Sequence, residues 1–176
     1  SFLNMHGKSP KLLHLATHGF YYTPNKAENV DYLKGYTDAM SLSGLVLSGC
    51  NAAWLGKPLP KGVLGGILSA NDIARLDLSN TDMVVLSACQ TGQGKATSEG
   101  LYGLQRAFKK AGVGTIVMSL WSVSDKTTSE FMTTFYERLA DKKNAWNKRK
   151  AFEEAKEIIR QRHPDPFHWA AFVMLD

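Results

Sequence analysis

The chain has 176 residues, 44% of them hydrophobic, which is typical of one domain with a sizeable core that needs no covalent cross-links. Its two cysteines, Cys50 and Cys89, argue against a disulfide framework and favour a reducing, cytoplasmic compartment. No apolar run approaches the ~20 residues that span a bilayer, and the N-terminal residues lack a secretory signal, so we expect no membrane contact.

The chain begins with Ser1 rather than Met, and its first expected core strand follows almost at once. We therefore expect residues 1–176 to be a single domain that forms the C-terminal part of a longer protein. The net charge of +5 is concentrated around Trp146, at Lys142, Lys143, Lys148, Arg149 and Lys150. Such a cluster could meet nucleic-acid phosphates. Because Glu153, Glu154 and Glu157 follow about one helical turn away, we favour a solvated helix face and no direct nucleic-acid binding.

Three short apolar runs, residues 12–17, 83–88 and 113–120, are predicted as strands buried on both faces. The segment between the last two has Leu101, Leu104 and Phe108 at helical spacing. Ser98 can cap this helix and Gly112 can end it. A strand, helix, strand crossover of this kind nearly always joins neighbouring parallel strands.

The remaining elements complete an α/β pattern. Residues 20–69 are rich in turn residues, with a strand-pair candidate at 41–50, and Ser69 with Asp72 is expected to cap a short helix at 70–76. Ser124 or Asp125 can begin a helix with an apolar side at Phe131, Met132, Phe135 and Leu139, and residues 145–162 form another with Phe152, Ala155 and Ile159. The prolines at 164 and 166 end that helix, and residues 167–175 are read as a final strand. The predicted fold is an α/β three-layer sandwich with a mostly parallel central sheet.

A histidine and a cysteine, which together can act as a base and a nucleophile, follow two of these strands. His18 and Cys89 lie just past strand ends, where a parallel sheet has its functional crevice. A cysteine thiol has a pKa of about 8.5, and an imidazole that takes its proton leaves a thiolate able to attack a carbonyl. The backbone amides of Gly19 and Cys89 are candidate donors to the resulting oxyanion. This pair is the minimum equipment of a cysteine peptidase.

The third strand end adds a candidate substrate pocket on the same rim. Trp121 could form its wall, and a buried Asp125 at its base would favour a basic side chain, through a bidentate bond if that side chain were arginine. The structural alternatives are core packing for Trp121 and helix capping for Asp125.

Other chemistries fit the sequence less well. A phosphate-binding loop before Lys95 would need Gly in place of Cys89 and a hydroxyl in place of Ala96. His14 and His18 share one side of a strand, yet no paired spacing typical of zinc ligands occurs. We therefore expect no metal and no organic cofactor. His14 is expected to be packed or partnered in the core, Cys50 to be a small buried hydrophobe, and His6, His163 and His168 to lie at the surface.

Five blocks of sequence, HLATHG, VVLSACQTGQG, EGLYGLQRAF, SLWSVSD and WAAFVML, carry a resemblance to a known family. In this order, from about residue 12 to residue 175, they resemble the CHAT domain, a caspase-like and separase-like peptidase domain often found behind tetratricopeptide repeats. The resemblance implies a caspase-haemoglobinase fold, a dyad of His18 and Cys89, and a contact of Asp125 with a basic residue before the scissile bond. It also implies further strands before residue 11. Gln90 and Ser124 stand where the family often has acidic residues.

The sequence thus predicts a cysteine endopeptidase that cleaves proteins through a thioester acyl-enzyme. From the resemblance we also expect control by an upstream tetratricopeptide-repeat region or by a regulatory partner. The alternative is a catalytically silent CHAT-fold module that binds other proteins, since fold does not fix function.

Overall fold

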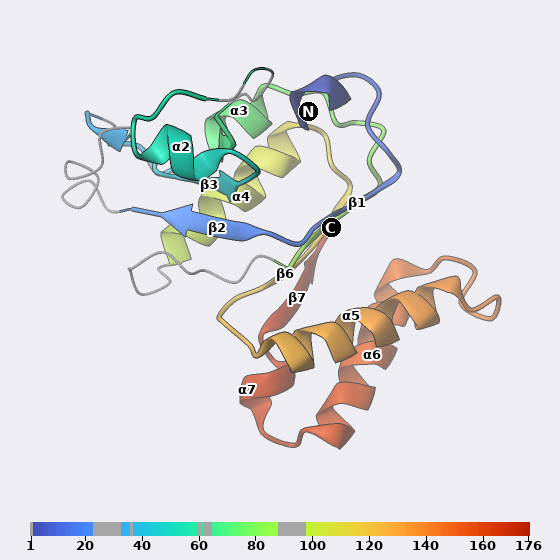
Figure 1. Cartoon of the computed structure of the whole chain (residues 1–176). Coiled ribbons are helices and arrows are strands. Elements are labelled where there is room, and N and C mark those ends of the chain that lie inside the picture. The colour runs from blue at the N-terminus through green and yellow to red at the C-terminus, as the bar shows by residue number, and fades with distance from the viewer. Residues whose placement is uncertain (1, 23–32, 36, 60, 62–64, 88–97) are drawn as a thin grey trace. The chain divides into compact units, whose positions relative to one another are not determined.

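The computed structural model describes residues 2–22, 33–35, 37–59, 61, 65–87 and 98–176, with side chains left out at 98–101 (Figure 1). The chain divides into two compact units, one of residues 1–116 with Asp176 and one of residues 117–175. The fold is mixed α/β, with a mostly parallel sheet of strand order β1-β5-β6-β7 flanked by helices. This confirms the predicted fold class.

Strands β1 (Leu12–Leu15) and β5 (Met83–Leu86) pair in parallel, with Leu15 opposite Leu86. All four residues of β5 are buried, as predicted. Burial of both faces is wrong for β1, because Leu13 is buried whereas His14 is exposed. Strand β1 stands at the end of the sheet order, where neighbouring elements cover a strand less completely. His14 Nε2 lies 2.9 Å from Ser87 Oγ, so this histidine is partnered but is not a core residue.

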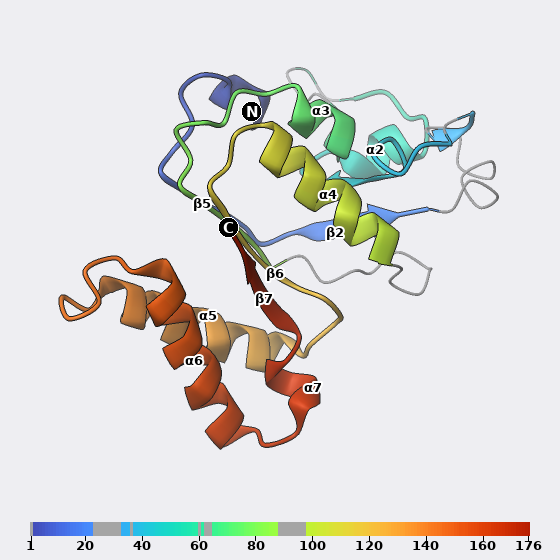
Figure 2. The same cartoon turned by 180° about the vertical axis from the view of Figure 1, so that it is seen from behind.

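Helix α4 (Ser98–Lys110) connects β5 to β6 (Thr115–Ser119), as the crossover pattern predicted. Gly112 has φ +95° and ends the helix, and the amide of Val113 donates to the carbonyl of Phe108 at 3.1 Å. This is the pattern of a glycine-terminated helix end. Figure 2 shows α4 beside the short helix α3 (Ala70–Ala74), which begins with the predicted capping box of Ser69 and Asp72.

Strand β7 (Phe172–Leu175) runs antiparallel to β6. The amide of Leu120 donates to the carbonyl of Ala171 at 2.8 Å, and Thr115 Oγ1 donates to Asp176 Oδ1 at 3.0 Å. Partners thus move in opposite directions along the two strands. The sheet is therefore parallel at β1 and β5 and ends in one antiparallel strand.

The first unit contains a second, antiparallel sheet that the sequence predicted only in part. Its strands, in the order β2-β3-β4, are β2 (His18–Tyr21), β3 (Ser43–Val46) and β4 (Ile67–Ser69). Only β3 lies within a predicted strand region. The unit also has a 3-10 turn, η1 (Phe2–Met5), and a short helix, α2 (Cys50–Trp54), which follows β3 directly.

The second unit is built on helices α5 (Asp125–Ala140) and α6 (Lys148–Arg162), which pack against each other. Its core is aromatic: the ring of Phe131 lies 3.9 Å from that of Phe172 and 5.5 Å from that of Phe152, centroid to centroid. Every apolar residue that the sequence assigned to the inner sides of these two helices is buried. Aromatic rings therefore contribute much of the apolar area that this unit buries.

Two boundaries in the second unit differ from the prediction. Helix α6 begins at Lys148 because Ala145 and Trp146 have positive φ values of 45° and 60°, and Asn147 caps the helix. The expected strand 167–175 is wrong in its first half, where α7 (Pro166–Trp169) forms instead. Asp165 caps α7 by accepting a hydrogen bond from the amide of Phe167 at 2.9 Å.

Among the described residues, no helix is both long enough and apolar enough for a membrane crossing.

Candidate functional site

His18 lies where the chain passes from strand β1 into the antiparallel sheet of the first unit. Strand β1 ends at Leu15, and after two residues the chain enters the antiparallel sheet, so that His18 is the first residue of β2. The Thr17 hydroxyl donates to the Val46 carbonyl, and His18 pairs with Val46 in the ladder. The His18 side chain is exposed. The sequence correctly predicted a strand end before this histidine and missed the strand that it begins.

The backbone amide of Gly19 points away from the ladder. The amide of Tyr22 donates to the carbonyl of Leu42 at 2.9 Å, which continues the β2–β3 register. Hydrogen-bonded pairs alternate with non-hydrogen-bonded pairs in an antiparallel ladder, so Gly19 and Leu45 form a pair of the second kind. Because β2 is at the edge of its sheet, the Gly19 N–H is directed away from β3 and is not used by the ladder, although Gly19 itself is buried.

A cavity of about 270 Å³ opens beside His18. Alternate residues of an extended strand share one face, and this face of the β2 segment contributes His18, Phe20 and Tyr22. The other lining residues are Gly19, Val46 of β3 and, from helix α2, Cys50, Asn51 and Trp54. The Trp54 ring lies 5.5 Å from the Phe20 ring and 5.8 Å from the Tyr22 ring, centroid to centroid. The cavity is therefore largely aromatic.

Two glycines allow this cavity to form. A Cβ on Gly44 would lie 2.8 Å from two ring carbons of Phe20 and would also overlap the backbone carbonyl oxygen of Leu68, so only glycine leaves room for both. Gly66 has φ +63°, and a Cβ there would meet the backbone of the turn between β3 and α2, 2.5 Å from the Cys50 nitrogen. Gly66 thus permits β4 to approach the start of α2.

The prediction that Cys50 is a small buried hydrophobe is wrong. It is half-buried rather than buried, because it opens helix α2 and lines the same cavity as His18. It is a free thiol, with Sγ 3.6 Å from Asn51 Oδ1. Gly49, directly before Cys50, has φ +94°. A glycine in this position is a local signal that the strand ends before Cys50.

Cys89, Gln90, Lys95 and Ala96 lie outside the described residues, so the approach of Cys89 to His18 stays a prediction. The strands that precede His18 and Cys89 in the chain, β1 and β5, are adjacent and parallel. Leu15 and Leu86 are parallel partners, and the amide of Ser87 donates to the carbonyl of Leu15 at 3.2 Å.

The other two predicted site residues belong to the second unit. Trp121 is half-buried, and its Nε1 donates to the carbonyl of Phe167 at 2.9 Å. Ser124 caps α5 by accepting from the amide of Thr127 at 3.2 Å. Asp125 is the first residue of α5 and is exposed, so it is neither the cap nor a buried carboxylate.

Other titratable residues have structural partners. Although the His14 side chain is exposed overall, partial desolvation of its ring lowers its pKa, and His163 Nε2 lies 2.7 Å from Glu130 Oε2. His6 is exposed, whereas His163 and His168 are half-buried. Within the described ranges, no group of three or more His, Cys, Asp or Glu could hold a metal ion.

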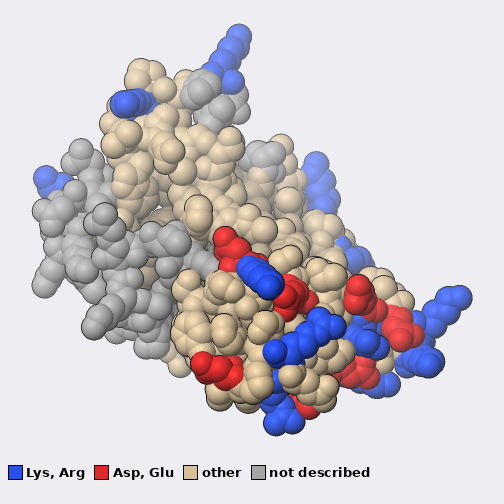
Figure 3. Space-filling view, turned by 60° about the horizontal axis from the view of Figure 1, so that its bottom comes forward, with Lys and Arg blue, Asp and Glu red and all other residues tan. Residues whose placement is uncertain are grey.

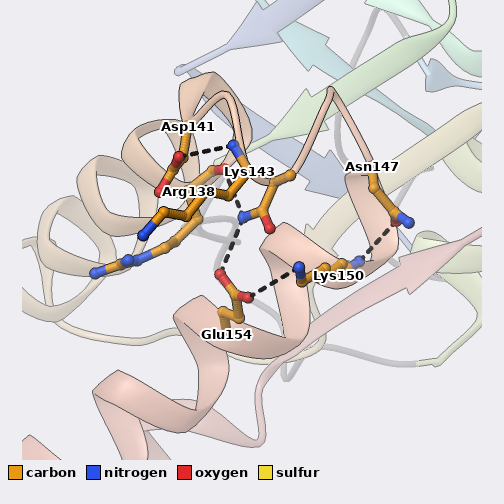
Figure 4. Close-up of polar contacts among 7 residues, drawn as sticks. Arg138, Asp141, Lys143, Asn147, Lys150 and Glu154 are labelled. Carbon is orange, nitrogen blue, oxygen red and sulfur yellow. Dashed lines mark hydrogen bonds and ion pairs between the residues drawn. The ribbon is translucent and has the colours of Figure 1, made fainter.

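Carboxylates lie close to the basic cluster around Trp146 in the sequence and in space. Figure 3 shows Lys and Arg side chains interspersed with Asp and Glu side chains on the face that it draws. Glu154 lies 3.9 Å from Lys150 Nζ and accepts a hydrogen bond from Asn144 at 3.0 Å (Figure 4). Asn144 in turn donates to the carbonyl of Arg138 at 2.8 Å, so Glu154 also holds the α5–α6 connection. These contacts fit a solvated helix face better than a continuous phosphate-binding surface.

Comparison with known proteins gives a family and two relatives. The CHAT domain model matches residues 1–176, the whole chain. Tetratricopeptide repeat protein 28 of Mus musculus is 32% identical over 111 residues, which are 62% of this chain and 4% of that protein. The Homo sapiens protein of the same name is 31% identical over 111 residues, again 62% of this chain and 4% of its own length. The chain therefore spans only a small fraction of the length of these relatives.

Proposed function

The chain belongs to the CHAT domain family, and from this premise we propose that it is a cysteine endopeptidase. Cys89 is the nucleophile, His18 is the general base and then the general acid, and the amides of Gly19 and Cys89 hold the oxyanion. No metal or organic cofactor takes part.

The observation that carries this proposal is the pairing of β1 with β5. Leu15 and Leu86 are parallel partners, and His18 and Cys89 each follow three residues later in the chain. Segments that leave adjacent parallel strands at the same edge start close together. The direction of the Gly19 amide, away from β3, gives independent support, because this donor is adjacent to His18 and is not used by the β2–β3 ladder.

The reaction needs only these groups. His18 accepts the thiol proton of Cys89, and the thiolate attacks the carbonyl carbon of the scissile peptide bond. The tetrahedral intermediate collapses as His18 gives the proton to the leaving nitrogen, which releases an amine and leaves a thioester. His18 then accepts a proton from water, the hydroxide attacks the thioester, and the carboxylic acid leaves as the Cys89 thiol is restored.

In this proposal Trp121 and Asp125 set the substrate preference. Asp125 attracts a basic side chain before the scissile bond, and Trp121 forms an apolar wall beside it. Because Asp125 is exposed, the attraction is that of a surface charge and is modest. The thiolate chemistry suits a reducing compartment such as the cytoplasm.

We expect the chain to work as one domain of a longer protein with tetratricopeptide repeats. The relatives named above carry such repeats in their names, and the matched region is 4% of each. An upstream repeat region or a bound partner would then control the peptidase.

The second candidate is a catalytically silent module that binds other proteins. It is favoured by the same relatives, which are named for their repeats rather than for peptidase activity. In that case His18 and Cys89 would have no catalytic role, and the thiol of Cys50 would react with a thiol-directed reagent as readily as that of Cys89.

A cleavage assay on a diverse peptide pool tests the proposal. We expect the native chain to cleave, and Cys89→Ala and His18→Ala each to lose at least about 10³-fold in rate. A thiol-directed peptide ketone gives a second readout, with Cys50 as the internal comparison because it lines the cavity beside His18. Selective, His18-dependent labelling of Cys89 supports the peptidase. Equal labelling of both cysteines, independent of His18, would favour the silent module.

A further inference from the structure

The cavity beside His18 has a volume and a lining suited to a single side chain. Its volume of about 270 Å³ lies below the ~300–1,000 Å³ of typical small-molecule pockets. Of its described lining residues, none is Asp, Glu, Lys or Arg. Phe20, Tyr22 and Trp54 supply three aromatic rings, whose apolar surface can contact an apolar side chain.

The cavity is also held open by the fold. Phe20 is buried and fixed over Gly44, whereas Tyr22 and Trp54 are only half-buried and expose part of their rings. Helix α2 carries Trp54, and Gly66 lets β4 approach the start of that helix closely. Tyr22 and Trp54 pack against the buried cluster of Phe20, Leu33 and Leu42, and walls that are packed before binding lower its entropy cost.

Its position relative to His18 decides which part of a substrate reaches it. A general acid must touch the nitrogen that leaves, so the residue after the scissile bond lies next to His18. His18 and Trp54 line the same cavity. Resting on the proposed peptidase function, we propose that this cavity binds the apolar side chain of the substrate residue that directly follows the cut, and so selects large aliphatic or aromatic residues there.

Peptides that differ only at the residue after the cut test this selection. For the native chain we expect kcat/KM to be about ten- to hundredfold higher with Phe or Leu than with Gly, as burial of one such side chain allows. Trp54→Ala, which removes one wall, and Val46→Phe, which fills the cavity, should each reduce that ratio to about threefold or less. The matched control Trp146→Ala changes an exposed tryptophan of the second unit and should leave the ratio unchanged. Cleavage with equal rates for Phe, Leu and Gly in the native chain, or an unchanged ratio in both cavity variants, overturns the inference.

A binding measurement separates this inference from the proposed catalysis. In ¹⁵N-labelled Cys89→Ala chain, the indole N–H signal of Trp54 can be assigned by its loss in Trp54→Phe. Titration with a short amidated peptide that begins with Phe, a mimic of the amine product, should shift the Trp54 signal saturably and leave that of Trp146 in place. A peptide that begins with Gly should bind at least about tenfold more weakly. Selective binding without any cleavage would refute the peptidase and retain the apolar cavity, whereas cleavage without selective binding would refute the cavity.

Discussion

The imidazole of His163 lies 2.7 Å from the carboxylate of Glu130 and joins the end of helix α6 to helix α5. The hydrogen bond from His163 lowers the pKa of Glu130 below its ordinary value of 4.5. A carboxyl group with a lowered pKa stabilises the folded state above its unfolded-state pKa, and this contribution is lost as the pH falls through the lower, folded-state value.

We therefore predict that Glu130→Gln lowers the Tm at pH 7 by roughly 1–4 °C and that the difference from the native chain shrinks at pH 3. Thermal unfolding followed by circular dichroism measures both values. Glu137→Gln, an exposed carboxylate on the same helix, is the control and should change the Tm less. A Tm difference that does not depend on pH would contradict the linkage.

The contact between Gly44 and the Phe20 ring predicts a second effect on stability. A methyl group at position 44 would overlap both that ring and the backbone carbonyl oxygen of Leu68, and overpacking of this kind costs about 1–3 kcal/mol. We expect Gly44→Ala to lower the free energy of unfolding by this amount in urea titrations. In a double-mutant cycle with Phe20→Leu, the two costs should fall only partly short of additivity, because the smaller side chain relieves the overlap with the ring but leaves the overlap with the Leu68 carbonyl. Strict additivity would argue against the ring contact as the cause.

Local signals predicted the elements that local residues determine. The capping box of Ser69 and Asp72 and the left-handed Gly112 are read directly from sequence, and both are present. Strand β2 was missed, because its pairing partner β3 lies more than 20 residues away and four residues alone give little periodicity. Helix α7 was also missed, although Asp165 and Pro166 together are a recognisable helix start.

The candidate site was also predictable only where local sequence determines it. The strand ends before His18 and Cys89 followed from two apolar runs, and the Leu15–Leu86 pairing agrees with them. The cavity could not be predicted, because it combines β2, β3 and a five-residue helix whose position depends on tertiary contacts. The exposure of Asp125 was equally hidden, since either Ser124 or Asp125 could have been the cap, and only the structure distinguishes them.

The hydrogen bond from Trp121 to the Phe167 carbonyl gives a third prediction. Trp121→Phe keeps an apolar ring but removes the Nε1 donor, which should lower the free energy of unfolding by about 0.5–1.5 kcal/mol. Trp146→Phe is the matched control, since Trp146 is 66% exposed and its replacement should change stability by less than about 0.5 kcal/mol. Urea unfolding of the three chains measures the difference. Equal stabilities would mean that the carbonyl of Phe167 is satisfied as well by water.

The last prediction concerns Asp125 and the residue before the scissile bond. Asp125 is exposed at the start of α5, and an exposed ion pair contributes about 0–1 kcal/mol, so we expect Asp125→Ala to reduce kcat/KM for peptides with Arg or Lys there by about two- to fivefold. Peptides with a neutral residue at that position should be cleaved as before. The effect should also weaken as salt rises, because mobile ions screen exposed charges. Glu153→Ala, an exposed carboxylate on α6, is the control for a general change in charge. If Asp125→Ala and Glu153→Ala have the same substrate profile as the native chain, Asp125 has no part in substrate recognition and serves only the first turn of its helix.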